Sequence, residues 1–290
     1  MNIKKYIIIV VVIFFFSLGF TLGLKQQLNK EYISPEEKQL EKNYQLQVRN
    51  DFMNSKNVYD SKTNSTNSPD QEYYEKAVKL HNQYPDTFIM KHQIHDKRIA
   101  LTFDDGPDAK TTIKILDILK QYNIPATFFV LGENVKSYPA VVKRMIAEGH
   151  QVANHSWSHL RPTDLSLEDF IAEIEPAEKI LQNYNSSSEP LYYRPPYGLV
   201  TPTQIEAMKE KGYKIISWSI DSLDWTEETE PEKIRDKVIS SAHPGAIVLM
   251  HCAGGNNNRI DTAIALPDII ESLKRQGYEF ATVHDLINDK

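Results

Sequence analysis

From about Ile94 to its end, the 290-residue chain alternates short apolar runs with amphipathic segments, and this rhythm constrains the fold more than any other feature. The first apolar run, RIALTF, begins at Arg98, and an amphipathic run, TTIKILDILKQYN, follows from Thr111. Runs this apolar predict strands buried on both faces, as in a parallel sheet covered by helices. About seven strand–helix pairs fit into about 195 residues, the size of one domain. We expect an α/β domain built as a closed or nearly closed β/α barrel, with an open doubly wound sheet as the alternative.

The N-terminus differs in kind, because residues 6–24 (YIIIVVVIFFFSLGFTLGL) carry no charge. As a helix this run would span about 28 Å, close to the ~30 Å hydrocarbon core of a bilayer. A cleaved signal peptide is the competing interpretation, but the run is long and no A-x-A-like site follows it. We therefore expect a transmembrane signal anchor at residues 6–24, after a short cytoplasmic N-terminus at residues 1–5. The lysines on either side of the run favour neither orientation strongly.

Residues 25–95 are expected to form an extracytoplasmic stalk, and residues 96–290 the folded domain. The stretch 54–71 is rich in Asn, Ser and Asp and poor in large aliphatic side chains, which is typical of a solvated linker. The run EYYEKAVKLHNQY, residues 72–84, could add a helix within the stalk.

The composition excludes several classes of protein. A chain with a net charge of −6 lacks the basic balance that nucleic acid binding needs, so we expect no nucleic acid partner. The only cysteine, Cys252, excludes an internal disulfide and a thiolate-rich metal site. We interpret Cys252 as a core thiol, because adjacent strand residues face opposite ways and it cannot share a site with His251. The sequence makes no prediction about the oligomeric state.

Polar residues of catalytic type follow the predicted strands. They lie in the five runs TFDDGP, HSWSH, RPPYG, DSLDW and LMH, of which the last ends at His251. In a β/α barrel the ends of parallel strands meet at one face, where active sites are built. The sequence therefore predicts one site that draws residues from five strands.

The acidic pair and the two histidines point to a metal ion. His155 and His159 are four residues apart, so on one helical turn both imidazoles would face the same ion. Asp104 and Asp105 would repel each other when buried unless a cation offset their charge. One of them is expected to ligate the metal, while its neighbour acts as a general base. The alternatives are structural histidines and an ordinary Asp-Gly-Pro turn.

Three further residues suit a hydrolytic site. Arg194 can hold the free carboxylate in a bidentate pair. The backbone N–H of Tyr197 could point at a developing oxyanion. His251 is a candidate general acid, with Asp221 or Asp224 raising its pKa. Among the aromatic residues, Trp225 and Trp157 could line a sugar pocket or pack in the core, whereas packing is the expected role for Tyr192 and Tyr193.

These five runs, in this order, resemble the motifs of the NodB-homology polysaccharide deacetylases, carbohydrate esterase family 4. The resemblance covers about residues 98–287 and leaves the anchor and the stalk outside. It implies a distorted (β/α)7 barrel as a catalytic domain at residues 96–290. It also implies a divalent-metal-dependent hydrolase that removes acetyl groups from N-acetylated sugars.

Matched residue by residue, the resemblance implies the following roles. Asp104 is similar to the family's catalytic base, which Arg194 braces, and the metal ligands are Asp105, His155 and His159. Asp221 is similar to the aspartate that tunes the acid His251. Tyr197 is similar to the residue whose backbone N–H stabilises the oxyanion, and the substrate contacts expected with it are Pro195 and Trp225. A metal-bound water would be the nucleophile. Zinc is the expected metal, with cobalt or nickel as alternatives.

The anchor suggests a cell-membrane enzyme whose catalytic domain lies outside the cytoplasm and deacetylates N-acetylglucosamine in peptidoglycan. Alternative substrates are N-acetylmuramic acid, chitooligosaccharides and exopolysaccharides. A glycan-binding scaffold without activity is the non-enzyme alternative.

Overall fold

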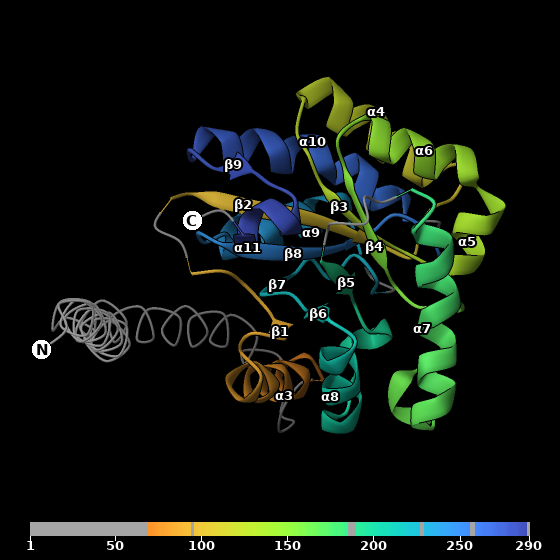
Figure 1. The fold of residues 1–290 in the computed structure, drawn as a ribbon. Helices are drawn as coiled ribbons and strands as arrows, with labels where there is room; N and C mark the ends of the chain where they lie inside the picture. Colours follow the sequence, from red (N-terminus) through yellow and green to blue (C-terminus); the bar gives the residue numbers. More distant parts are fainter. Residues whose placement is uncertain (1–68, 94–95, 185–189, 227–228, 256–258, 289–290) are drawn as a thin grey trace, which may run out of the picture. The chain divides into compact units, whose positions relative to one another are not determined.

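The computed structural model describes residues 69–93, 96–184, 190–226, 229–255 and 259–288 (Figure 1). The strands of this part are β1 (Phe88–Ile89), β2 (Arg98–Asp104), β3 (Thr127–Val130), β4 (Gln151–Asn154), β5 (Leu191–Tyr193), β6 (Tyr213–Ile216), β7 (Ile220–Asp221), β8 (Ala246–His251) and β9 (Glu279–Phe280). The helices are α3 (Pro69–Gln83), α4 (Thr111–Tyr122), α5 (Gly132–Ser137), α6 (Pro139–Ala147), α7 (Leu167–Leu181), α8 (Pro202–Glu210), α9 (Pro231–Ser241), α10 (Ile260–Arg275) and α11 (Val283–Asn288). Two short 3-10 helices are η1 (Pro162–Asp164) and η2 (Pro196–Gly198).

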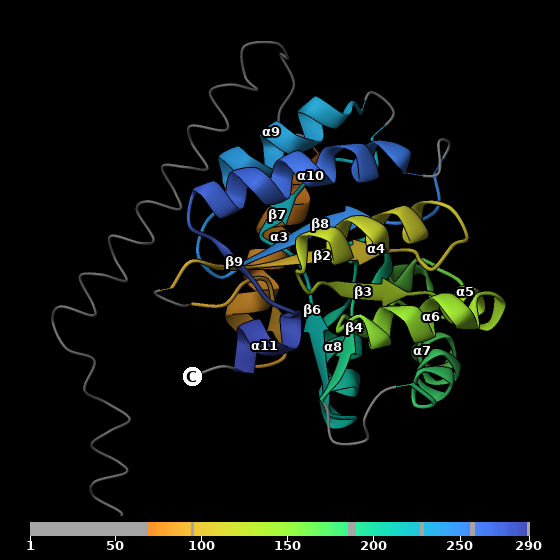
Figure 2. The ribbon, with the colours of Figure 1, turned by 90° about the horizontal axis from the view of Figure 1, so that it is seen from above.

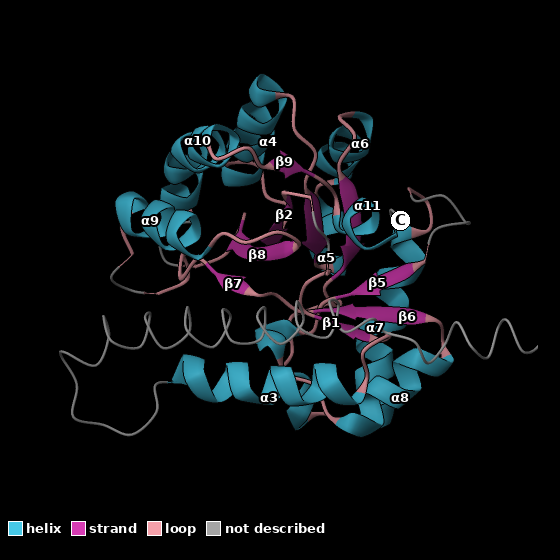
Figure 3. Ribbon diagram, turned by 90° about the vertical axis from the view of Figure 1, so that its left-hand side faces the viewer, coloured by secondary structure: helices cyan, strands magenta, loops and turns pink. Residues whose placement is uncertain are grey.

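The strands form one parallel sheet in the order β1-β6-β5-β4-β3-β2-β8-β7, with β9 also paired to β2. The sheet is curled, and helices such as α4, α6 and α10 lie on the outside (Figure 3). Helix α11 instead contributes Val283 and Leu286 to an apolar cluster inside the curl. Its two end strands, β1 and β7, share no ladder within the described residues, although Lys91, just after β1, bridges to Ala246 at the start of β8. The α/β class with a curled parallel sheet is therefore confirmed. The curl is a half-barrel rather than a closed ring of seven strands in the described part.

Central strand β2 shows why the sheet is buried on both faces. Ile99, Leu101 and Phe103 point into a cluster with side chains of α4 and α10. Ala100, between them, faces a second cluster inside the curl, which also contains Phe129. Figure 2 shows α4 and α10 side by side over one part of the sheet. The continuous apolar runs therefore reflect burial on both faces, as the sequence predicts.

Two of the described helices, α7 and α8, begin at residues whose side chains cap them. Ser166 precedes α7, and its side chain accepts a hydrogen bond from the Asp169 backbone N–H. Thr201 precedes α8 and forms a reciprocal capping box with Gln204, while Pro202 occupies the first turn. Such caps satisfy backbone N–H groups that have no partner within the helix.

Residues 214–221 (KIISWSID) are one continuous run in the sequence but belong to two strands in different places. β6 lies between β5 and β1, whereas β7 pairs with β8. Between them the Ser217 N–H donates to Ile89 and the Ser219 N–H donates to Ile247, so the chain passes from one end of the sheet to the other within three residues. Periodicity cannot reveal this change of partner, because both halves remain extended and apolar.

The predicted stalk boundary at residue 95 differs from the structure. Helix α3 and strand β1 precede that boundary, yet β1 pairs in register with β6, and α3 buries Ala77 to 2% exposure. Together with Phe88 these side chains belong to an apolar cluster that includes Ile215 of β6. The packed domain therefore includes residues 69–93, because their apolar faces cover one end of the sheet.

No helix among the described residues combines the length and apolar character needed to cross a bilayer. The predicted anchor at residues 6–24 lies outside the described residues.

Candidate active site

The acidic residue that ends β2, Asp104, is buried and paired with a buried arginine. The Arg194 Nη1 atom donates to Asp104 Oδ1 at 2.7 Å and also to the Thr102 hydroxyl at 2.7 Å. The Arg194 Nε and Nη2 atoms donate to the carbonyls of Ile216 and Ser217. The contact with Asp104 uses one nitrogen, so the expected bidentate pair is not formed. Arg194 instead divides its donors between the carboxylate and the end of β6.

The neighbouring residue, Asp105, meets both histidines. Its Oδ1 atom lies 3.5 Å from His155 Nε2 and 3.3 Å from His159 Nε2. The described residues contain one cluster of this kind, in which ligand atoms of Asp105, His155 and His159 all lie within 4.8 Å of one another. Asp105 turns towards the histidines because its backbone is left-handed (φ 72°), which separates its side chain from that of Asp104.

The chemistry of this cluster fits a divalent metal. Asp105 Oδ1 is buried and has no hydrogen-bond partner, which is costly unless a cation or water satisfies it. His155 Nδ1 donates to the Arg194 carbonyl at 2.7 Å, so in the neutral ring Nε2 offers a lone pair towards Asp105. Burial, and then the neighbouring His155, lower the pKa of His159 to about 4, which keeps this ring neutral as a ligand must be. Burial would raise the pKa of Asp105, but the three surrounding histidines hold it well below its usual range.

The two histidines do not lie on a helical turn. Residues 155–161 form a loop, in which Ser156 (φ 70°) and His159 (φ 64°) are left-handed. Conformations of this kind cost free energy in residues other than glycine and are often found at functional sites. The sequence spacing predicts the ligands correctly but not the backbone that brings them together.

Two side chains that the sequence analysis does not identify hold this loop. Asn154, at the end of β4, accepts from the Ser156 N–H at 2.8 Å. Glu173 of α7 accepts from both the backbone N–H and the hydroxyl of Ser158, at 2.9 and 3.0 Å. In the sequence, Glu173 lies one helical turn before the buried Ala177, so its polar side chain falls on the packed side of α7. This pattern suggests that Glu173 has a structural role, but it does not identify Ser158 as the partner.

On the other side of Asp104, the strand register brings in the candidate acid. Asp104 of β2 and His251 of β8 are direct partners across the parallel pair. The His251 Nδ1 atom lies 2.7 Å from Asp224 Oδ1, and Asp224 Oδ2 accepts from the His251 backbone N–H and the Thr262 hydroxyl. Burial would lower the pKa of His251, but the Asp224 carboxylate outweighs it and raises that pKa to about 9.

The structure thus corrects the choice of Asp221 as the partner of the acid. Asp221 pairs in register with Leu249, two residues before His251, and accepts instead from the Leu223 N–H and the Trp225 indole. Asp224 lies three residues after Asp221, and its carboxylate contacts the His251 ring. Burial and the nearby Asp224 charge raise the pKa of Asp221 to about 6, against the Leu223 hydrogen bond.

The remaining predicted contacts lie around the metal cluster and the acid. Tyr197 is 56% exposed, and the centroid of its ring is 4.7 Å from that of the His159 ring. Trp225 is also exposed, whereas Pro195, two residues before Tyr197, is buried. The Trp157 ring packs against Gly132 so closely that a Cβ added there would clash with it. Tyr197 and Trp225 are therefore available to a ligand, and Trp157 packs against protein.

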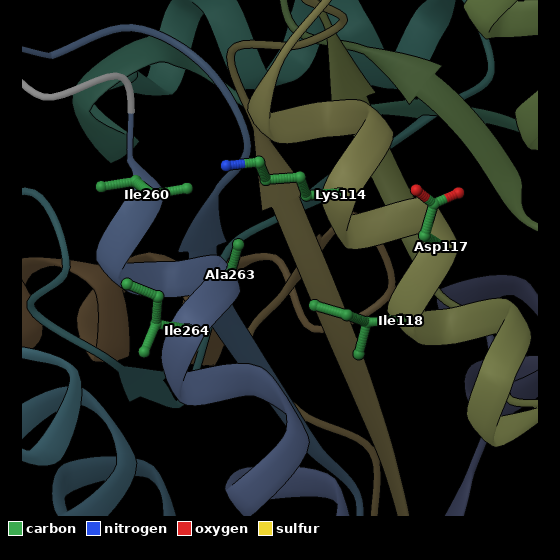
Figure 4. A pocket seen from close by; sticks show the side chains of 6 residues that line it. All are labelled: Lys114, Asp117, Ile118, Ile260, Ala263 and Ile264. Carbon is green, nitrogen blue, oxygen red and sulfur yellow. The ribbon is translucent and has the colours of Figure 1, made fainter.

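Cys252 is fully buried, with its Sγ atom 3.3 Å from the Asp104 carbonyl, and burial raises the pKa of its thiol. It is a core thiol, as predicted. A shallow apolar groove elsewhere on the surface contains none of the candidate site residues. Figure 4 shows the side chains that line it, from α4 (Lys114, Asp117, Ile118) and α10 (Ile260, Ala263, Ile264).

One edge of the sheet thus holds a carboxylate braced by arginine, a three-ligand cluster suited to a metal and an imidazole held by a carboxylate. A base, a Lewis-acid site and an acid in this order are the groups that metal-assisted hydrolysis requires.

Comparison with known proteins agrees with this class. Residues 91–216 match the family described as polysaccharide deacetylase. A peptidoglycan-N-acetylglucosamine deacetylase of Bacillus cereus is 39% identical over 198 residues, which are 68% of this chain and 91% of the relative. A peptidoglycan-N-acetylmuramic acid deacetylase of Bacillus subtilis is 36% identical over 67% of this chain and 73% of its own length. A longer N-acetylglucosamine deacetylase of Listeria monocytogenes is 42% identical to this chain, which covers only 40% of that relative's length.

Solved structures show the same fold. The crystal structure of a peptidoglycan N-acetylglucosamine deacetylase bound to a benzamide compound has a TM-score of 0.65 at 35% identity, over 69% of this chain and 92% of that one. The chain therefore belongs to the polysaccharide deacetylase family, as its five motifs predict. It is a hydrolase of carbohydrate esterase family 4.

Proposed function

We propose that this polysaccharide deacetylase removes N-acetyl groups from N-acetylglucosamine residues of peptidoglycan. The observation that carries the proposal is the placement of Asp104 between the Asp105–histidine cluster and His251. Its Oδ2 atom lies 3.8 Å from His155 Nε2, and its backbone pairs with that of His251. Base, metal ligands and acid can thus act on a single amide.

Asp105, His155 and His159 would hold a divalent metal, zinc in our proposal. When bound there, a divalent cation polarises a carbonyl and makes water more acidic. The buried, unpartnered Asp105 Oδ1 atom supports this assignment, because a cation would satisfy it.

The chain's own residues would move the protons. Asp104 takes a proton from the attacking water, while Arg194 fixes the orientation of its carboxylate through Oδ1. The Tyr197 backbone N–H stabilises negative charge on the acetyl oxygen. His251, kept protonated by Asp224, gives a proton to the departing sugar nitrogen. The exposed rings of Tyr197 and Trp225 provide surface for a sugar.

N-acetylglucosamine is the first choice because curated relatives named for that substrate are 39% and 42% identical to this chain. N-acetylmuramic acid is the second candidate, because relatives named for it are 36% and 39% identical. The test is acetate release from peptidoglycan, followed by digestion of the product and identification of the sugar that carries the free amine.

Release of acetate, lost with a chelator and restored by zinc, is the expected result. A free amine on muramic acid would support the second candidate. Binding of peptidoglycan without acetate release by the zinc-loaded protein would support a glycan-binding scaffold and overturn the enzyme proposal.

We further propose that residues 6–24 anchor the chain in the cell membrane with the catalytic domain outside the cytoplasm. The uncharged apolar run supports this, because its length suits one bilayer crossing. In bacterial cells, protease added to spheroplasts should cleave the domain of the full chain. Protection of the domain until the cells are lysed would overturn this orientation.

A further inference from the structure

Helix α3 brings an aromatic side chain to the back of the candidate site. Tyr73 lies in the first half of α3, before the residues that match the family. Its ring stacks on Trp218, with centroids 4.7 Å apart and planes 15° apart. Its hydroxyl lies 2.8 Å from the hydroxyl of Ser217, at the end of β6. A residue of the predicted stalk thus contacts the strand end that carries Arg194's carbonyl partners.

The contact with Ser217 leads directly to the base. Ser217 is fully buried, and its carbonyl accepts from Arg194 Nη2 at 3.2 Å, while Arg194 Nη1 donates to Asp104. The Arg194 guanidinium also lies over the rings of Phe129 and Trp218, at 4.0 and 5.8 Å. Tyr73 therefore contacts Ser217 and Trp218, and Arg194 contacts the same two residues.

The same ring limits the position of the turn that follows Arg194. A Cβ added at Gly198 would lie 2.5 Å from Tyr73 Cε2 and 2.6 Å from both Tyr73 Oη and Trp218. Gly198 is left-handed (φ 66°), as is the preceding Tyr197 (φ 59°). The backbone of the turn thus rests on the Tyr73–Trp218 stack, which leaves it little room to move away from His159.

We propose that Tyr73 is a positioning residue for deacetylation, which holds the Arg194–Asp104 pair and the Tyr197–Gly198 turn in their working geometry. This inference rests on the proposed function for its kinetic readout. Because the turn and the base act on the transition state, loss of Tyr73 lowers kcat more than it changes KM. Helix α3 then holds catalytic residues in position and is not a spacer.

The test compares three variants in the full chain. Tyr73→Phe keeps the stack and removes the hydroxyl, and Tyr73→Ala removes both. Tyr74→Ala is the matched control, because Tyr74 packs against the apolar cluster from the same helix but makes none of the contacts described above with Ser217, Trp218 or Gly198. Acetate release is measured with zinc present, well below each variant's unfolding midpoint. We expect kcat to fall about threefold in Tyr73→Phe and about tenfold or more in Tyr73→Ala, since small misplacements of catalytic groups are costly.

KM should change less than about twofold, and Tyr74→Ala should keep the wild-type kcat even where it lowers the unfolding midpoint. Ser217→Ala adds a second check, since Tyr73→Phe and Ser217→Ala remove the same hydrogen bond and their combination should cost little more than either alone. Wild-type kcat in folded Tyr73→Phe and Tyr73→Ala, or equal losses in Tyr74→Ala, would overturn the proposal. If Tyr73→Ala does not fold, additive losses in the Tyr73→Phe/Ser217→Ala pair would overturn it.

If the wild-type chain releases no acetate from any glycan, the proposed function fails, and a crystal structure of Tyr73→Phe then decides this inference. A displaced Arg194 would support it, and an Arg194–Asp104 contact kept at 2.7 Å would contradict it.

Discussion

The pairing of His251 with Asp224 leads to a sharp prediction for Asp224→Asn. The substitution removes the negative charge 2.7 Å from the His251 ring and leaves a side chain of the same size. Asp224 Oδ2 also accepts from the His251 backbone and from Thr262, so an amide cannot satisfy all three donors at once. The imidazolium loses the group that stabilises it, while its burial remains.

The expected size of this effect follows from the pKa of His251. A rise from 6.5 to about 9 corresponds to about 3 kcal/mol of preferential stabilisation of the charged ring. Without Asp224, burial is opposed only by the charges of Asp105 and Asp104, so that pKa falls towards its ordinary value of 6.5. A full return to 6.5 would lower the protonated fraction at pH 8 by about thirtyfold. In the wild type, the stability that the raised pKa contributes is fully present below pH 6.5 and is lost as pH rises through about 9.

The assay is the pH dependence of kcat/KM for acetate release. The wild type should lose activity as pH rises through about 9, because the acid must be protonated. In Asp224→Asn this alkaline limb should move down towards pH 6.5. Asp221→Asn is the matched control: it changes the same residue type three positions away, in a residue bonded to Leu223 and Trp225, and should leave the alkaline limb in place.

Two results would refute the reasoning. One is a shift of the alkaline limb in Asp221→Asn that equals or exceeds the shift in Asp224→Asn. The other is a direct titration of the wild-type His251 ring, by nuclear magnetic resonance, that places its pKa near 6.5. Unfolding curves in the same buffers show whether each variant is folded over the pH range used.

Three further predictions concern the cluster, its loop and the thiol. Asp105→Asn should bind much less metal and lose acetate release, measured as metal content after dialysis; full metal content would contradict the ligand assignment. Glu173→Gln should weaken metal binding about tenfold, because it loosens the anchor of Ser158, whereas Glu175→Gln, on the same helix in a surface ion pair, should not. Equal affinities in a zinc competition assay would argue against this role. Cys252 should react with a thiol reagent only on unfolding, since it is buried; rapid labelling of the native protein would show that it is accessible.

The class of the fold and the residue types of the ligands could be predicted because they depend on local pattern. Apolar runs such as RIALTF predict a strand buried on both faces, and β2 begins at the same residue, Arg98. Residue type and place after strands indicate His155, His159 and one of the two adjacent aspartates as ligands. The resemblance to the family selects Asp105, and the structure brings these three together. Neither inference needs to know which strands are neighbours.

The predictions that were wrong depended on strand register and on packing between segments that are distant in the sequence. Asp221 and Asp224 are equivalent in a sequence, and only the pairing of Asp221 with Leu249 shows that Asp224 reaches His251. The expected helical turn at His155 is a loop, because Glu173 and Asn154 hold it from other elements.

The sequence by itself determined an α/β chain with a charge-free N-terminal run and a set of acids, bases and metal ligands at strand ends. These properties follow from hydrophobic periodicity and from residue chemistry, which act over a few neighbouring positions. Only the tertiary structure decided that the sheet curls into a half-barrel and that α3 belongs to the domain. The same is true of the placement of Tyr73 behind Arg194. These features arise from contacts between residues distant in the sequence, such as Tyr73 and Ser217, which are 144 positions apart. The free energy of such contacts depends on geometry that a linear pattern does not contain.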